Sequence, residues 1–252
     1  PREAMEVMNL LRQNAKLCDV TLRAGNETFH AHKVVLAAAS PYFKAMFCTS
    51  GMKECAMSEI PLHNVSPCVL NTIIEFAYTS EICVTEMNVC TLLPTATMLA
   101  MTHLVEACCT FLEHQLDPSN CIGIADFAQA HGCRELYHKA RMFIYHNFSR
   151  VCENEEFMQL SPNQLTQVIK RDELNVRCES EVYDAVISWV RHEPCKRLNK
   201  LDQLLGAVRC HFLTPCFLQL QLADCDVLHK APKCKAYLQR IYQDQLLHRR
   251  CA

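Results

Sequence analysis

The sequence predicts an α+β module with a short-stranded sheet over residues 1–116, followed by an all-α module over residues 117–252. Two observations support this division. Strand patterns occur only before about residue 85, whereas apolar residues at helical spacing continue along the rest of the chain. Five prolines directly follow Ser, Thr or Asp, the usual pairing of a helix N-cap with the first helical position. We therefore expect a mostly helical protein with few strands.

The first module is predicted to open with a helix and a β-hairpin. Met5, Met8 and Leu11 recur at helical spacing, which indicates an amphipathic helix. Apolar and polar residues then alternate on either side of a turn at Gly25, the pattern of two antiparallel strands. The predicted strands, including a third short one, cover residues 20–23, 28–32 and 59–62.

After these strands, every element is predicted to be a helix. The predicted ranges are roughly 86–98, 102–115, 118–130, 134–148, 161–170, 180–192, 200–207, 215–223 and 233–247. The helix starts marked by proline are Ser40-Pro41, Ser66-Pro67, Asp117-Pro118, Ser161-Pro162 and Thr214-Pro215. The joint between the two modules is placed at Leu116-Asp117-Pro118, where proline restarts the helix.

Composition and charge argue against several classes of protein. The formal net charge is −2, which gives no reason to expect a nucleic-acid partner. No apolar run reaches the ~18 residues of a spanning helix, so we expect no membrane partner. The N-terminus is acidic and polar, which does not fit a signal peptide and suggests a segment cut from a longer protein.

The 18 cysteines lack the spacing of a zinc module, because no two of them are three residues apart. A disulfide framework is typical of small secreted chains, and this chain is neither small nor preceded by a signal peptide. We therefore expect reduced thiols in a cytoplasmic or nuclear protein, most of them packed as small core residues.

Nothing in the sequence indicates an active site. With only 5 glycines, the chain has no glycine-rich phosphate loop, and no nucleophile elbow or oxyanion turn is recognisable. Because the chain contains many cysteines and histidines, its composition alone does not exclude a catalytic Cys-His pair. We expect no catalytic residue and no cofactor.

Family motifs occur in order along both modules. The first carries Cys18-Asp19-Val20, Phe29-His30-Ala31-His32-Lys33, Leu36–Phe43 and Phe76-Ala77-Tyr78-Thr79, and it resembles a BTB/POZ domain. The second carries Asn120-Cys121-Ile122-Gly123-Ile124, Arg171-Asp172-Glu173-Leu174 and Glu179–Tyr183, and it resembles a BACK domain. Together they resemble the BTB-BACK region of BTB-Kelch proteins, and among these the oxidative-stress sensors.

This resemblance implies a homodimeric, non-catalytic substrate adaptor of a cullin-3 RING ubiquitin ligase. The BTB domain would dimerise and bind the N-terminal region of cullin-3, with residues 117–135 extending that surface as the family's 3-box. The BACK domain would orient a Kelch propeller that is absent from this chain. By resemblance, the propeller would bind a bZIP stress-response factor, and cysteines would sense electrophiles and oxidants.

Two other functions stay open. A BTB transcriptional repressor recruits corepressor peptides through its dimer groove, although such proteins usually join the BTB domain to zinc fingers through a disordered linker. Some BTB-Kelch proteins are actin-associated scaffolds. Binding to cullin-3 would distinguish the adaptor from both.

The residues assigned to docking surfaces depend mainly on the resemblance. The dimer interface is expected at Met5, Met8, Leu11 and Val20, and the cullin contact at Tyr42, Phe43, Phe47, Met52, Glu54 and Tyr78. Met52-Lys53-Glu54 matches the hydrophobic-x-Glu pattern of BTB adaptors, in which an apolar anchor enters a groove and a carboxylate adds a directional hydrogen bond. Ordinary core packing is the alternative for Phe43 and Phe47.

The histidine pair raises the question of a metal site. His30 and His32 are two residues apart in a predicted strand, so both could reach one ion, with Asp19 as a candidate third ligand. The resemblance argues for structural packing instead, because His-Lys is part of the fold motif. We therefore expect no bound metal.

The candidate sensor cysteines are Cys210, Cys225, Cys234, Cys195 and Cys178. Basic neighbours in the sequence favour four of them as reactive thiols, whereas Cys225 lies between two aspartates. The resemblance nevertheless supports Cys225, together with Cys210 and Cys234. The sensors' BTB cysteine corresponds to Asn88 here, and Cys90, two residues later, would face elsewhere on the helix.

Overall fold

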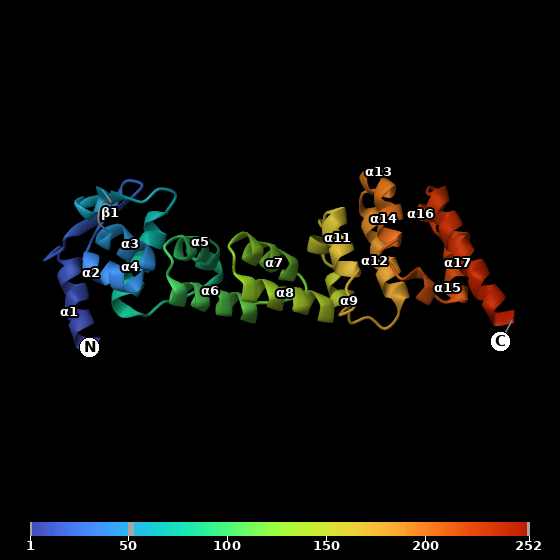
Figure 1. Ribbon diagram of the computed structural model, residues 1–252, viewed down its shortest axis with the longest axis horizontal. Helices are drawn as coiled ribbons and strands as arrows, with labels where there is room; N and C mark the ends of the chain where they lie inside the picture. Colours follow the sequence, from blue (N-terminus) through green and yellow to red (C-terminus); the bar gives the residue numbers. More distant parts are fainter. Residues whose placement is uncertain (1, 50–52, 251–252) are drawn as a thin grey trace. The chain divides into compact units, whose positions relative to one another are not determined.

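The computed structural model describes residues 2–49 and 53–250, which divide into two compact units (Figure 1). The first unit contains the chain up to Gln115 together with Ala130–Leu136, and the second contains Leu116–Gln129 and the chain from Tyr137 onward. All strands among the described residues lie in the first unit, and the second is helical. The predicted fold class, an α+β module before an all-α module, is confirmed.

A three-stranded sheet with the order β2-β1-β3 forms one part of the first unit. The strands are β1 (Val20–Ala24), β2 (Glu27–Ala31) and β3 (Glu59–Pro61). A two-residue turn joins β1 to β2 antiparallel, and Gly25 adopts the positive φ of +56° that this turn requires. Strand β3 pairs parallel to β1. Every predicted strand is therefore present to within one residue at each end.

Helices pack around this sheet. They are α1 (Arg2–Gln13), α2 (Lys33–Ala39), α3 (Pro41–Cys48), the 3-10 turn η1 (Lys53–Cys55), α4 (Pro67–Thr79), α5 (Glu86–Met98) and α6 (Thr102–His114). Alternate residues of β1 are buried, beginning with Val20 and Leu22, as the apolar alternation predicts. Leu70 and Ile74 of α4 and Leu93 of α5 are fully buried in the same unit. This core positions α1, α2 and α4 side by side.

Four of the five predicted N-caps form. Each side-chain oxygen accepts a hydrogen bond from the backbone N–H three residues later, as predicted for Ser40, Ser66, Ser161 and Thr214. The fifth prediction is right about the hydrogen bond and wrong about the helix start. The Asp117 carboxylate accepts from the Ser119 N–H at 2.9 Å within a turn, but the next helix begins only at Cys121. The Glu156 carboxylate caps that helix by accepting from the N–H groups of Ile122 and Gly123, each at 3.1 Å.

The second unit is built from helices and 3-10 turns. They are α7 (Cys121–Ala130), α8 (Arg134–His146), α9 (Phe148–Val151), α10 (Glu155–Met158), α11 (Pro162–Ile169), α12 (Glu179–His192), α13 (Pro194–Arg197), η2 (Leu198–Lys200), α14 (Leu201–Leu205), η3 (Cys210–Phe212), α15 (Pro215–Asp224), α16 (Asp226–His229) and α17 (Pro232–Arg250). Trp189 of α12 belongs to the core of this unit and is fully buried, as are Tyr183, Phe148 and Phe157. None of the helices that the structure describes is long and apolar enough to cross a bilayer.

Candidate functional site

The first helix leaves an apolar face partly uncovered. Met5, Met8 and Leu11 are half-buried against the unit, whereas Val7 is 56% exposed and Leu10 is 59% exposed. Val20, predicted to lie in the same interface, is only 2% exposed and belongs to the core of the sheet. The sequence could not place Val20 correctly, because a buried strand residue and an interface residue are both apolar.

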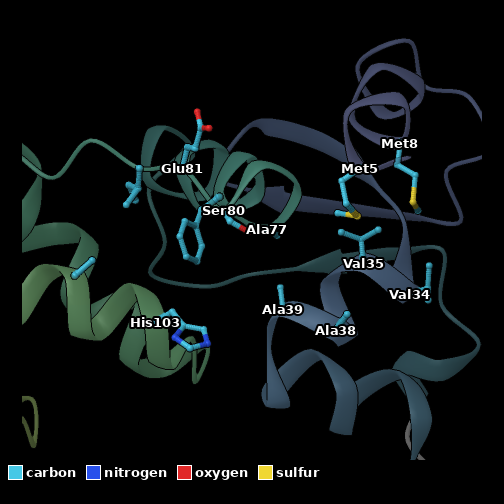
Figure 2. A pocket seen from close by; sticks show the side chains of 13 residues that line it. Met5, Met8, Val34, Val35, Ala38, Ala39, Ala77, Ser80, Glu81 and His103 are labelled. Carbon is cyan, nitrogen blue, oxygen red and sulfur yellow. The ribbon is translucent and has the colours of Figure 1, made fainter. Parts of the chain in front are cut away.

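An apolar groove of about 920 Å³ lies beside this helix (Figure 2). It is lined by Met5, Met8, Val34, Val35, Ala38, Ala39, Phe76, Ala77, Ser80, Glu81, Ile82, His103 and Ala107. In Figure 2, Met5 and Met8 of α1 lie across from Val34 and Val35 of α2, and His103 of α6 stands farther along the groove. Apart from Ser80, Glu81 and His103, the lining is apolar and includes two flexible methionines, which suits contact with another apolar surface.

Sequence reasoning missed Val34. Its side chain is 67% exposed, although it follows directly on the strand motif and precedes the buried residues Val35 and Leu36. A signal was present, because three successive apolar residues on a helix cannot all face one core. One of them must therefore point away from the subunit's own interior.

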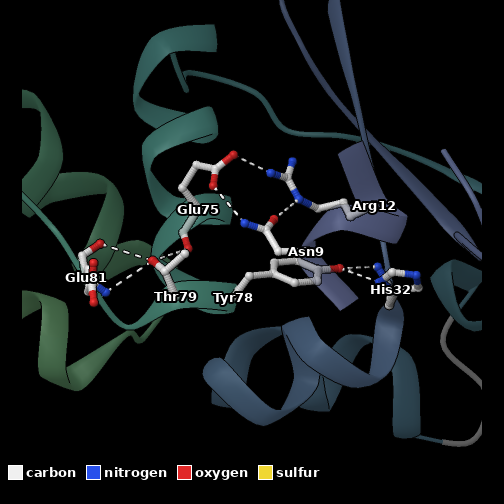
Figure 3. A network of polar contacts seen from close by, with 7 residues as sticks. All are labelled: Asn9, Arg12, His32, Glu75, Tyr78, Thr79 and Glu81. Carbon is white, nitrogen blue, oxygen red and sulfur yellow. Dashed lines mark hydrogen bonds and ion pairs between the residues drawn. The ribbon is translucent and has the colours of Figure 1, made fainter. Parts of the chain in front are cut away.

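A polar network holds α1 in place (Figure 3). The Arg12 guanidinium is only 7% exposed and pairs with the Glu75 carboxylate of α4. Arg12 Nε donates to Asn9 Oδ1 at 2.9 Å, and Asn9 Nδ2 donates to Glu75 at 3.3 Å. The guanidinium carbon is 5.2 Å from the centre of the Tyr78 ring. Because an unpaired buried charge would be costly, these contacts fix the helix that carries the exposed apolar face.

Tyr78 continues this network to the end of the hairpin. The backbone N–H of His32 donates to the Tyr78 hydroxyl at 2.8 Å, and that hydroxyl is 2.7 Å from His32 Nδ1. His32 Nε2 is 3.3 Å from the Lys16 carbonyl oxygen, which can only accept, so Nε2 carries the proton and Nδ1 accepts from Tyr78. Burial raises the pKa of Tyr78 to about 12, which keeps the hydroxyl protonated. Tyr78 is therefore a structural residue.

The two histidines differ in burial and in their contacts. Strand β2 ends at Ala31, so His32 is the buried residue that precedes α2, whereas His30 is exposed and its Nδ1 is 3.1 Å from Thr21 Oγ1. The two imidazoles therefore have separate hydrogen-bond partners. In the described ranges 2–49 and 53–250, no group of three or more His, Cys, Asp or Glu side chains could hold a metal ion.

A second exposed surface is formed by α3 and η1. Tyr42 of α3 is 37% exposed, and Phe47 of the same helix is half-buried. Lys33 Nζ donates to the Cys55 carbonyl oxygen at 2.9 Å and lies 5.4 Å from the centre of the Phe47 ring. These contacts hold η1, which carries the half-buried Glu54, next to α3. This surface therefore includes aromatic side chains on α3 and a carboxylate on η1.

Two predicted cullin contacts are absent from this surface. Phe43 is 1% exposed and Tyr78 is 3% exposed, so both are core residues of the first unit. Met52 lies outside the described residues. Tyr42, Phe47 and Glu54 stay as candidates. Lys33, which the sequence motif indicated only as part of the fold, is a further residue of this surface because it holds η1 next to α3.

Burial divides the five candidate sensor cysteines. Cys178 and Cys195 are exposed, whereas Cys210, Cys225 and Cys234 are buried. Since an electrophile must reach the sulfur, exposure favours the first two. Sequence neighbours alone could not make this distinction.

The basic residues next to Cys210 in the sequence predicted a lowered pKa for its thiol, and this prediction is wrong. Burial and the Glu179 carboxylate raise the pKa of its thiol to about 12, the opposite of the predicted direction. The neighbouring Arg209 guanidinium is paired with Asp172 and lies 3.8 Å from Glu179. Burial also raises the pKa of Cys234, with the Asp202 carboxylate as a further cause. At both thiols, the groups that surround the sulfur in the folded protein therefore shift the pKa in the direction opposite to the one predicted from the sequence neighbours.

Asn88 has a structural role in α5. Its side-chain oxygen accepts from the Thr85 N–H at 2.8 Å, and its side-chain nitrogen donates to the Cys83 carbonyl oxygen at 2.9 Å. These bonds satisfy backbone groups at the start of the helix. Cys90, two residues later, is exposed.

The chain is similar to known proteins along most of its length. The BTB/POZ domain family matches residues 8–116, and the family described as BTB And C-terminal Kelch, or BACK, matches residues 121–223. Kelch-like ECH-associated protein 1B of Danio rerio is 49% identical over 252 residues, which cover 98% of this chain and 42% of that protein. This chain therefore spans less than half the length of that relative. Among solved structures, the BTB domain of zebrafish PATZ1 is 36% identical with a TM-score of 0.41, over 45% of this chain and 91% of that chain.

Proposed function

The chain belongs to the Kelch-like family that joins a BTB/POZ domain to a BACK domain, and we propose that it is a homodimeric, non-catalytic substrate adaptor of a cullin-3 RING ubiquitin ligase. The observation that carries the proposal is the apolar groove between α1, α2 and α4, together with the uncovered side chains beside it. The proposed location is the cytoplasm, with access to the nucleus.

The groove supports a two-fold contact with a second copy. A monomer would leave Val7, Leu10 and Val34 in water on neighbouring elements, each more than half exposed. Several exposed apolar side chains beside an apolar groove are typical of an interaction surface. A two-fold interface places the same patch on both subunits, so the helix face of one copy can enter the groove of the other. The α1 network with Arg12 and Glu75 keeps this surface rigid before the partner arrives.

The surface of α3 and η1 is the proposed contact for the N-terminal region of cullin-3. Tyr42 and Phe47 would cover an apolar segment of the partner, and Glu54 would accept a hydrogen bond at the edge. Substrate binding is assigned to a Kelch propeller and not to these two domains. The proposed substrate class is a bZIP stress-response factor, as the resemblance implies.

Replacing Glu54 with Ala is expected to weaken cullin-3 binding about 10- to 100-fold, because a hydrogen bond to a charged group contributes roughly 1.5–3 kcal/mol. Titration calorimetry with the cullin-3 N-terminal segment measures the affinity, and a sizing column checks that the dimer is intact. Glu27→Ala, an exposed carboxylate on β2, is the matched control and should bind as the parent does. Unchanged binding of Glu54→Ala would contradict the placement, and no binding by the parent chain would contradict the adaptor function.

We further propose that exposed thiols give the adaptor a sensing function. Under limiting alkylating reagent, Cys178 and Cys195 are expected to be modified before Cys210 and Cys234, because the latter two are buried and their pKa values are raised. Peptide mass spectrometry over a time course gives the order. Early modification of Cys210 would show that burial in the resting protein does not control reactivity.

A further inference from the structure

The 3-10 turn η1 is too short to fix its own position. It contains three residues, and its internal hydrogen bonds are long. The Ala56 N–H donates to the Lys53 carbonyl oxygen at 3.2 Å. The Met57 N–H donates to the Glu54 carbonyl oxygen at 3.3 Å. A single 3-10 turn has poor hydrogen-bond geometry, so the place of Glu54, the proposed cullin-3 contact, depends on what joins η1 to the rest of the first unit.

The Cys55 thiol makes such a connection to α3. Its sulfur lies 3.1 Å from the carbonyl oxygen of Phe47, 3.4 Å from that of Met46 and 3.3 Å from that of Thr49. Met46 and Phe47 belong to the last turn of α3, where carbonyl groups lack donors within the helix. A carbonyl oxygen can only accept, so the thiol is the donor, and its single proton serves one carbonyl at a time. Cys55 thus docks η1 on the C-terminal end of α3.

The Lys33 ammonium group joins η1 to a second element. Lys33 Nζ donates to the Cys55 carbonyl oxygen at 2.9 Å. The backbone N–H of Lys33 donates to Asp19 Oδ1 at 2.7 Å, which ties the start of α2 to the residue before β1. Within the described ranges, the side chains that form hydrogen bonds between η1 and other elements are those of Cys55 and Lys33. Both connections reach η1 at Cys55, the residue next to Glu54.

We infer that Cys55 is a positioning residue for the cullin-3 contact. Its thiol donates a hydrogen bond at the end of α3, and this bond sets the place of the adjacent Glu54 carboxylate. Cys55 acts through Glu54 and needs no contact with the partner. The consequence for cullin-3 rests on the proposed adaptor function, whereas the docking of η1 by the thiol is a property of the chain alone.

Apolar packing is the competing role for this side chain. Cys55 is half-buried, and cysteine often packs as a small hydrophobic residue. The two roles predict opposite results for serine. A hydroxyl keeps a proton donor, so Cys55→Ser retains the docking if the thiol acts as a donor. If the thiol only fills apolar space, the polar serine is no better than alanine.

Hydrogen exchange of the Ala56 and Met57 amides tests the docking in the full chain without a partner. Cys55→Ala is expected to raise their exchange rates about fivefold, the change that losing one ordinary hydrogen bond produces, and Lys33→Met should raise them similarly. Cys55→Ser should stay within about twofold of the parent. Cys68→Ala removes an exposed thiol on α4 and is the matched control, which should exchange as the parent does. Parent-like exchange in Cys55→Ala, or exchange in Cys55→Ser as fast as in Cys55→Ala, would overturn the inference.

Titration calorimetry with the cullin-3 N-terminal segment tests the consequence for binding. Cys55→Ala is expected to weaken binding about fivefold, while Cys55→Ser should bind within about twofold of the parent. Glu54→Ala combined with Cys55→Ala should bind no more weakly than Glu54→Ala alone, because the two residues act through one contact. Thermal melting and a sizing column check that each variant is folded and has the oligomeric state of the parent.

The two measurements separate this inference from the adaptor function. A Cys55→Ala variant that exchanges faster but binds cullin-3 as the parent does would show that the thiol does not position the contact. An additive loss in the double variant would also contradict action through Glu54. If the parent chain did not bind cullin-3, the adaptor function would fail and the positioning role with it. The exchange rates of Cys55→Ala and Cys55→Ser would then still support or overturn the docking of η1 by the thiol.

Discussion

Met8→Glu combined with Val34→Glu is expected to convert the proposed dimer into a monomer. Both side chains line the groove, and Val34 is 67% exposed in the single chain, so the substitutions should be tolerated by the folded subunit. In a two-fold interface each change occurs twice, which brings four carboxylates into an apolar contact. Burying each one without a partner costs several kcal/mol, so the dissociation constant should rise more than 100-fold. Sedimentation velocity over a concentration series measures the shift.

The control for this experiment lies on the other unit. Phe212 is 71% exposed on η3, and Phe212→Glu adds charge to an apolar surface position without touching the groove. It should dimerise as the parent does. Thermal melting must show that the double variant is folded, because Met8 is half-buried and contributes to packing of α1. A folded double variant that still dimerises would show that the two-fold contact uses another surface.

Local sequence patterns predicted the framework of the fold well. Strand alternation at Val20 and Leu22 and the Ser-Pro and Thr-Pro helix starts depend on neighbours within a few residues, so the sequence contains the information directly. At Asp117 the predicted side-chain hydrogen bond is present, but the helix begins only at Cys121, where a distant side chain, Glu156, caps it. A pattern confined to neighbouring residues cannot detect such a competitor.

The candidate sites were harder to predict, for a related reason. Phe43 and Tyr78 have the apolar and aromatic character of contact residues, but only the packed structure shows that they are buried. At Cys210, the adjacent Arg209 indicated a reactive thiol, yet that guanidinium pairs with carboxylates and the sulfur is enclosed. Exposure and charge pairing are properties of the tertiary structure. Predictions of contact residues and reactive thiols that depended on exposure and charge pairing therefore required the tertiary structure.

Trp189→Ala is expected to lower the free energy of unfolding of the second unit by about 3–5 kcal/mol, the usual cost of removing a large buried aromatic side chain. The ring is 1% exposed, and its Nε1–H donates to the Leu160 carbonyl oxygen at 3.0 Å. The Arg197 guanidinium carbon lies 4.2 Å from the ring centre, and Arg197 is only 9% exposed. The substitution would therefore leave a cavity, an unpaired carbonyl group and a buried cation without its aromatic partner.

Urea unfolding followed by circular dichroism measures this loss. Trp189→Phe keeps part of the ring but not the N–H donor, so it should destabilise less than alanine does. Phe212→Ala, at an exposed position, should change the free energy of unfolding by less than about 0.5 kcal/mol. Trp189 is the chain's one tryptophan, so its fluorescence reports unfolding of the second unit in the parent and in Phe212→Ala. If Trp189→Ala unfolded at the same urea concentration as the parent, α12 would not be the centre of this core. Dimerisation should persist in every folded Trp189 or Phe212 variant, because the groove belongs entirely to the first unit.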